Sequence, residues 1–225
     1  MDDEAVARYL KENPAFFEQH GELLAEVSVP NPHGGAAISL TDRQMLTLRE
    51  RGRQLEAKLS ELLHFGEEND ALGEKMHRLS VALVAAPSQD RLLDALQFNL
   101  REDLAIPHVA LRVWGGNTVE AGARAESAPV SDELKQYAAS LSEPFCGPSG
   151  QAEAEAIGWL GESASAIRSV GLIALREQGA AGTQGACIGL LMLASEELKR
   201  FYPEMGTVYL RRLGELASAG LARFL

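Results

Sequence analysis

The longest regular pattern in the chain is an apolar stripe that runs through residues 40–86. The positions that stand seven residues apart are Leu48, Leu55, Leu62, Asn69, Met76 and Leu83. The seam between them contains the further apolar residues Met45, Leu59, Leu72 and Leu79. No proline interrupts the segment between Thr41 and Pro87. The pattern predicts one long amphipathic helix with a coiled-coil seam.

This stripe predicts self-association. Gly52, Gly66 and Gly73 lie within the helix, and each costs about 1 kcal/mol relative to alanine. Each apolar side chain of the seam returns about 1.5–3 kcal/mol if it is buried. Burial outweighs the glycines only if a partner covers the stripe, so we expect a parallel homodimer. The expected dimer contacts are Leu48, Leu55, Leu59, Leu62, Asn69, Leu72, Met76, Leu79 and Leu83.

Asn69 is the polar member of the seam. A buried asparagine at such a position fixes the register and the two-stranded state of a coiled coil. Alternatively, Asn69 marks the point where the helix bends away from its partner. The sequence leaves both interpretations open.

Short helices are predicted before the long helix, in a segment of residues 1–39. Two of them, at 4–13 and 14–27, are separated by Pro14, which the first helix cannot pass. Their apolar side chains are too few for an independent core. Residues 28–39 contain two prolines and two glycines and are predicted to form a loop.

Residues 87–225 mix helical and strand patterns. Helices are expected at 91–104, 131–141, 152–161 and 202–225, strands at Val109–Trp114, 118–121, 169–177 and 186–195, and a loop at 144–150. The last two strands are apolar on both faces, as central strands are. The expected fold class is α+β: short N-terminal helices and a long coiled-coil helix at 40–86, then an antiparallel sheet flanked by helices at 87–225.

Composition narrows the function classes. The formal net charge of −11 argues against binding to nucleic-acid backbone or anionic lipid. The longest apolar runs are strand length, so no membrane span is expected, and the acidic N-terminus favours the cytoplasm. The histidines are scattered, and Cys146 and Cys187 lack the spacing of a metal site. No catalytic motif, metal site or cofactor site is identified.

Several stretches resemble a known family: VARYLKENPAFFEQH, VPNPHGGAAISLTDRQMLTLRER, FCGP and GLLMLASEELKRFYPEMGTVYLRRLGEL. Together they make the chain similar to the bacterial family called domain of unknown function 484. The C-terminal part resembles a GAF domain, a small-molecule sensory fold. The resemblance implies that fold and a dimer, and no specific activity. The NKFDE pattern of cyclic-nucleotide-binding GAF domains is absent from the sequence.

The GAF resemblance also implies a pocket between the sheet and the irregular helical insert. By position, its candidate residues are Arg112, Trp114, Phe145, Cys146, Trp159 and Arg168. Arginine suits an anion and tryptophan a planar or apolar group. The alternative is that both tryptophans are packing residues and that Arg168 is a surface residue.

The resulting hypothesis is a dimeric cytoplasmic sensory or regulatory protein. Its GAF-like domain would bind a small molecule, and the long helix would pass its state to a downstream protein partner. The alternative is a dimeric adaptor without a ligand. A third hypothesis is a thiol-dependent reductase that uses Cys146, because GAF-like reductases of this kind use loop cysteines.

Overall fold

The computed structural model describes residues 2–23, 27–29, 38–114, 124–177 and 185–224. Contacts divide the chain into two units, Met1–Asn69 and Asp70–Leu225. The long helix α4, Leu40–Ala85, includes the point of division. The sequence pattern instead places domain boundaries at residues 39 and 86. The α+β class is confirmed.

The first unit consists of short elements followed by the N-terminal part of α4. Its elements are α1 (Asp3–Glu12), α2 (Ala15–Gln19), β1 (Ser28–Val29) and β2 (Ile38–Ser39). The two strands pair antiparallel within the segment predicted as a loop. Helix α2 ends earlier than predicted, and residues 24–26 of that prediction lie outside the described residues. Tyr9 packs edge-on against Phe16, with ring centroids 6.4 Å apart.

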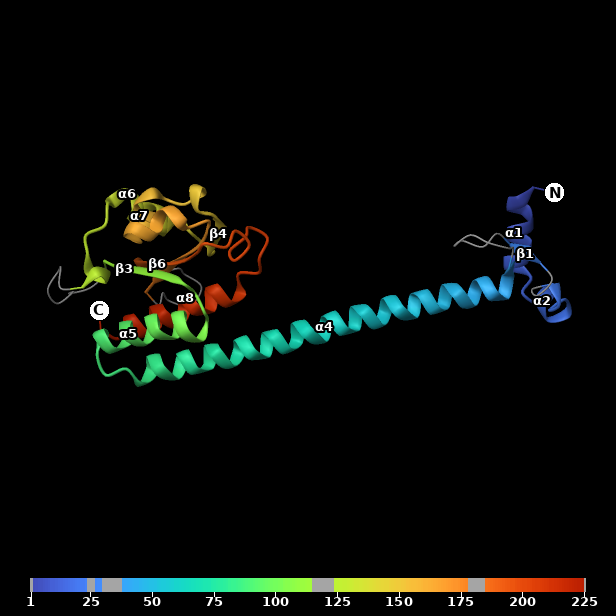
Figure 1. Ribbon diagram of the computed structural model, residues 1–225, viewed down its shortest axis with the longest axis horizontal. Helices are drawn as coiled ribbons and strands as arrows, with labels where there is room; N and C mark the ends of the chain where they lie inside the picture. The colour runs from blue at the N-terminus through green and yellow to red at the C-terminus, as the bar shows by residue number, and fades with distance from the viewer. Residues whose placement is uncertain (1, 24–26, 30–37, 115–123, 178–184, 225) are drawn as a thin grey trace. The chain divides into compact units, whose positions relative to one another are not determined.

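The second unit contains a sheet and the helices on both of its faces (Figure 1). Its helices are α5 (Gln89–Phe98), α6 (Asp132–Ser140), α7 (Ala154–Gly158) and α8 (Val208–Leu221). Short helical turns are η1 (Asn99–Asp103), η2 (Ala125–Ser127), η3 (Ser149–Gln151) and η4 (Gly161–Ala166). The strands are β3 (His108–Val113), β4 (Phe145–Pro148), β5 (Ser169–Arg176) and β6 (Cys187–Ser195).

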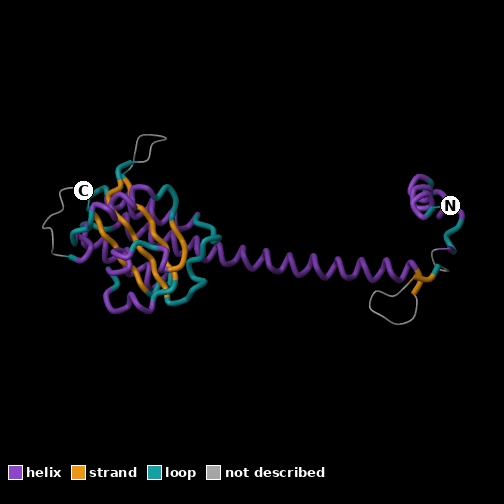
Figure 2. Tube along the Cα trace, turned by 90° about the horizontal axis from the view of Figure 1, so that it is seen from above, coloured by secondary structure: helices purple, strands orange, loops and turns teal. Residues whose placement is uncertain are grey.

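The sheet is antiparallel in the order β3-β6-β5-β4. Figure 2 draws its strands in orange. The central strands are β5 and β6, as their apolar pattern predicts, and Ile173 pairs with Leu191 between them. The predicted strand at 118–121 lies outside the described residues.

The predicted loop at 144–150 is wrong in its central part, because Phe145–Pro148 form the edge strand β4. Cys146 pairs with Gly171 of β5. Proline and glycine indicate a loop by composition, but proline is tolerated on an edge strand, where its missing N–H removes no ladder bond.

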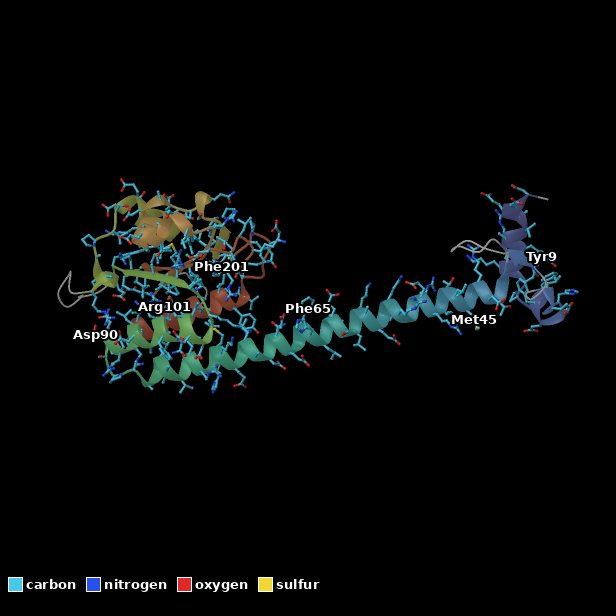
Figure 3. All side chains as sticks on the ribbon, viewed as in Figure 1. Tyr9, Met45, Phe65, Asp90, Arg101 and Phe201 are labelled. Atoms are coloured by element: carbon cyan, nitrogen blue, oxygen red, sulfur yellow. The ribbon has the colours of Figure 1, made fainter. Side chains whose placement is uncertain are left out.

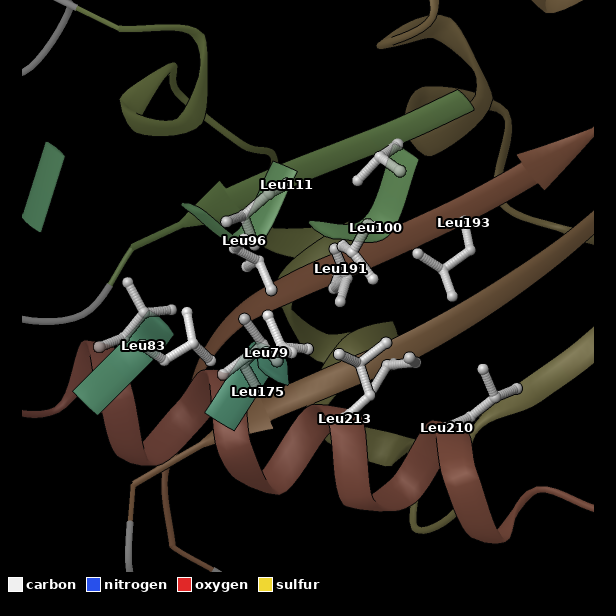
Figure 4. Close-up of a cluster of buried hydrophobic side chains, with 14 of the residues drawn as sticks. Leu79, Leu83, Leu96, Leu100, Leu111, Leu175, Leu191, Leu193, Leu210 and Leu213 are labelled. Carbon is white, nitrogen blue, oxygen red and sulfur yellow. The ribbon is translucent and has the colours of Figure 1, made fainter. Parts of the chain in front are cut away.

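Alternation along the strands sorts side chains to the two faces. Leu111 and Leu191 lie in a leucine-rich cluster with α5, α8 and the last turns of α4 (Figure 4). Leu172, Leu190 and Met192 lie in a second cluster with α6 and α7. The sheet therefore has a helix face, covered by α4, α5 and α8, and an insert face, covered by α6 and α7.

The C-terminal end of α4 is fixed within the second unit. Leu79 is fully buried and Leu83 nearly so. Arg223, beyond the end of α8, donates from Nη1 to the carbonyl oxygens of Leu83 at 3.2 Å and Val84 at 3.1 Å, and from Nη2 to Ala86 at 3.3 Å. These bonds satisfy carbonyls that a helix leaves open at its end. None of the helices that the structure describes is long and apolar enough to cross a membrane.

Candidate functional site

The N-terminal part of α4 exposes the predicted seam. Leu48, Leu55, Leu59 and Leu62 have exposed fractions between 58% and 68%. Nearby, Met45 and Phe65 also project from the helix into solvent (Figure 3). A row of exposed leucines on one helix face is the arrangement that a second apolar helix covers.

The glycines of α4 belong to the same seam. A row at seven-residue spacing lies beside the leucines: Met45, Gly52, Leu59, Gly66 and Gly73. A Cβ added at Gly52, Gly66 or Gly73 would meet no atom of the chain within 4 Å. The glycines therefore leave open space on the face that carries the leucines, which is available to side chains of a partner helix.

The C-terminal members of the seam are covered by their own chain. Met76, Leu79 and Leu83 are buried in the core of the second unit, and Leu72 is half-buried. Asn69 is exposed at the last position of the first unit. Of the expected dimer contacts, the chain leaves five exposed: Leu48, Leu55, Leu59, Leu62 and Asn69.

The structure brings four of the six predicted pocket residues together on the insert face. Trp114, Phe145 and Trp159 are half-buried and pack against the cluster around Leu190. The Arg112 guanidinium carbon lies 4.8 Å from the ring centroid of Trp159, a cation–π geometry. The space between sheet and insert is therefore occupied by side chains at these positions.

Hydrogen bonds hold two of these side chains in place. The indole N–H of Trp114 donates to the Cys187 carbonyl at 2.9 Å. Nη1 of Arg112 donates to the Leu111 carbonyl at 3.0 Å. Burial lowers the pKa of Arg112, and the carboxylates of Glu126 and Glu155 act in the opposite direction. Both aromatic and cationic groups thus have structural partners on this face.

Cys146 lies on the other side of the sheet. Its side chain is buried in the cluster of the helix face, whereas Cys187 packs in the cluster of the insert face. Burial raises the pKa of the Cys146 thiol to about 11 and also raises the pKa of Cys187. At neutral pH Cys146 is therefore protonated, which is the unreactive form of a thiol.

Arg168 is the sixth predicted pocket residue, and the structure places it on the surface. Its backbone N–H donates to the Ser195 carbonyl at 2.9 Å, and its own carbonyl accepts from Ser149 at 3.1 Å. These bonds continue the pairing of β4, β5 and β6 at one end of the sheet. Among the described residues, no hydrogen bond or cation–π pair joins Arg168 to Arg112 or Trp159.

A cavity of about 460 Å³ opens on the helix face, away from the predicted pocket. It lies among the last turns of α4, the approach to β3, the segment after β6 and the start of α8. Its lining is mostly apolar: Leu72, Met76, Leu104, Ile106, Leu193, Phe201, Met205, Gly206, Tyr209, Leu210 and Leu213, with Glu197, Lys199 and Arg200 as the charged members.

The charged members of this lining differ in their bonding. Arg200 donates from Nη2 to the carbonyl oxygens of Leu104 at 2.9 Å and Ala105 at 3.3 Å. Ala105 has a positive φ of 50°, so this arginine holds a strained turn at the edge of the cavity. Within the described part of the chain, Lys199 forms no hydrogen bond or ion pair.

Comparison with known proteins gives a family. The family model described as "Protein of unknown function, DUF484" matches residues 1–225. The chain belongs to this family. It is 25% identical over 230 residues to the uncharacterized protein YigA of Salmonella typhimurium, covering 100% of this chain and 93% of that protein. It is 31% identical over 115 residues to YigA of Shigella flexneri, covering 51% and 48% respectively. YigA of Escherichia coli K12 is 30% identical over 115 residues, with the same coverage.

The cavity on the helix face was not predicted from the sequence. Its lining comes from residues far apart in the chain, such as Leu72, Ile106 and Phe201. The available signal was local: the segment 199–205 places two cations beside Phe201 and Met205. Among the described residues, no group of three or more His, Cys, Asp or Glu side chains could hold a metal ion.

Proposed function

We propose that this protein is a homodimeric sensory or regulatory protein. Two copies of α4 would form a parallel coiled coil, and the unit of residues 70–225 would be a GAF-like domain that binds a small molecule. The long helix would carry the bound state to a downstream protein partner. The proposal is supported above all by the exposed leucines of α4, Leu48 to Leu62.

The length of the stripe supports a helical partner over a single point contact. The exposed leucines from Leu48 to Leu62 span four turns of helix, about 21 Å. Burial of each leucine stabilises by about 1.5–3 kcal/mol. A second copy offers the same stripe, and the open space at Gly52 and Gly66 allows close approach of its side chains.

The dimer is tested by placing charge on the stripe. Leu55→Glu with Leu62→Glu is expected to convert the dimer to a monomer, because four carboxylates would be buried without partners. Native mass spectrometry and light scattering of the full chain measure the subunit count. The matched control, Ala57→Glu with Ser60→Glu, adds the same charge to exposed positions on other faces of α4, and is expected to stay dimeric. A wild-type chain that is monomeric at micromolar concentration contradicts the proposal.

An adaptor without a ligand is the second candidate. It is supported by the insert face, where Trp114, Phe145 and Trp159 occupy the space in which GAF domains bind their ligand. Native mass spectrometry of the protein as purified separates the two functions. A dimer with a bound small molecule favours the sensor, and a dimer that neither retains nor is stabilised by any metabolite in a thermal-shift screen favours the adaptor.

A further inference from the structure

We infer that the cavity of the helix face binds a small amphipathic monoanion, such as an alkyl or aryl carboxylate. The inference rests on the proposed sensory function and names its site and its ligand class. The apolar part of the ligand would lie between α4 and α8, and its carboxylate would bind Lys199.

The size and lining of the cavity support a small molecule. Its volume of about 460 Å³ falls in the range of small-molecule sites, roughly 300–1,000 Å³. The walls come from leucine, isoleucine, methionine and phenylalanine side chains, including Met76, Phe201 and Leu213. Such walls favour the transfer of an alkyl chain or a ring from water.

The charge of the lining selects the head group. Lys199 and Arg200 carry positive charge and Glu197 carries negative charge, so the lining has a net charge of +1 in a chain whose net charge is −11. Arg200 already donates to the carbonyl oxygens of Leu104 and Ala105. Lys199 is therefore the ammonium available to an anion. With one available cation and the carboxylate of Glu197 in the same lining, the cavity suits a ligand with a single negative charge better than a doubly charged phosphate.

The location of the cavity connects it to the long helix. Leu72 and Met76 of α4 form part of its wall, and Met76 also belongs to the leucine-rich core. A ligand in the cavity would therefore touch the same helix that exposes Leu48 to Leu62. By contrast, the predicted pocket on the insert face has no contact with α4 among the residues that pack there.

Calorimetric titration of the full chain with sodium octanoate tests the ligand class. Octanoate is expected to bind, with 1-octanol about tenfold weaker and octylammonium weaker still, because the two lack the charge that Lys199 recognises. Lys199→Glu is expected to weaken octanoate about tenfold or more. The matched control Arg91→Glu makes the same charge change at an exposed position outside the cavity, and is expected to leave the affinity unchanged.

A second pair of variants tests the cavity itself. A Cβ at Gly206 would meet no atom within 4 Å, and Gly206 lines the cavity. Gly206→Leu is therefore expected to fold and to weaken octanoate about tenfold. Gly158 has equally open space and lies on α7, on the insert face, so Gly158→Leu serves as its control.

The outcomes separate this inference from the proposed dimer. Equal binding of octanoate and octanol, or an affinity unchanged in Lys199→Glu, overturns the anion class. An affinity unchanged in Gly206→Leu, or no octanoate binding at all, overturns the site. Light scattering of the same samples gives the subunit count. If the chain is a dimer and does not bind octanoate, only the proposed ligand site is overturned. If the chain is a monomer and binds octanoate, only the proposed dimer is overturned. Binding by the monomeric Leu55→Glu, Leu62→Glu variant but not by the wild-type dimer would show that the second copy occupies the cavity, and also overturns the inference.

Discussion

The two parts of α4 carry the same seven-residue pattern in different surroundings. In the part up to Asn69, Leu48, Leu55 and Leu62 are exposed. In the part from Asp70 onward, Met76 and Leu83 continue the spacing and are buried by α5 and α8. One pattern therefore serves a core within the chain in one part and an exposed face in the other.

The difference shows what a heptad pattern specifies. The pattern predicts that a helix face will be covered, because solvent-exposed leucines do not gain the free energy of burial. It does not specify whether the cover comes from the same chain or from a second one. Here the same chain covers the C-terminal part, and we propose that a second copy covers the N-terminal part. The predictions below separate the two kinds of cover.

The largest loss in the free energy of unfolding is expected from truncating a side chain in the buried part of the stripe. Leu79→Ala removes a fully buried side chain and is expected to lower the free energy of unfolding of the second unit by about 2–5 kcal/mol. Leu55→Ala is expected to change it by less than about 0.5 kcal/mol. Urea unfolding monitored by tryptophan fluorescence measures this unit alone, since both tryptophans, Trp114 and Trp159, belong to it. Equal effects of the two variants would contradict the division of the stripe.

Cys146 reports how well the core that buries Leu79 excludes water. Its pKa is raised to about 11 in the folded chain, whereas an unfolded thiol ionises near pH 8.5, so the unfolded chain loses its proton first. The stability conferred by the neutral thiol is therefore present below about pH 8.5 and decreases as the pH rises to about 11, by about 3 kcal/mol.

The pH effect is measured as a difference between two chains. Urea unfolding of wild type and Cys146→Ala between pH 8 and pH 11 cancels the titration of lysines and tyrosines. The wild type is expected to lose stability relative to Cys146→Ala as the pH rises. A constant difference would show that the thiol is not buried in a dry core, and would restore the hypothesis of a reactive Cys146.

The comparison also shows how far the sequence could be interpreted. The helix Leu40–Ala85 and the central strands were predictable, because heptad spacing and two-faced apolar runs are local patterns. The edge strand at Phe145–Pro148 was not, since β5 supplies its ladder bonds and the local composition indicates a loop. The sequence also could not show that Leu79 and Leu83 are covered by α5 and α8. Only the fold brings these distant segments together. The same holds for the cavity that Leu72 and Phe201 line.

A smaller effect is expected from Arg223, which closes the buried end of α4. Arg223→Ala removes three hydrogen bonds to the carbonyl oxygens of Leu83, Val84 and Ala86. We expect a loss of about 1–2 kcal/mol in the unfolding of the second unit. Arg223→Lys is expected to recover part of it, because one ammonium cannot reproduce the planar guanidinium. The control is Arg101→Ala, an exposed arginine of the same unit; an equal loss there would assign the effect to net charge.

The smallest effect is expected from the glycines, and it tests the comparison most directly. Gly52 and Gly73 are seam positions in the first and second units, and both have open space for a Cβ. Alanine stabilises a helix by about 1 kcal/mol relative to glycine at either position. Gly73→Ala is expected to shift the unfolding curve seen by tryptophan fluorescence. Gly52→Ala should shift only the helical signal in circular dichroism, because no tryptophan lies in its unit. If Gly52→Ala shifted the fluorescence curve by the same amount, α4 would unfold as one piece with the sheet, and the two parts of its stripe would share one core.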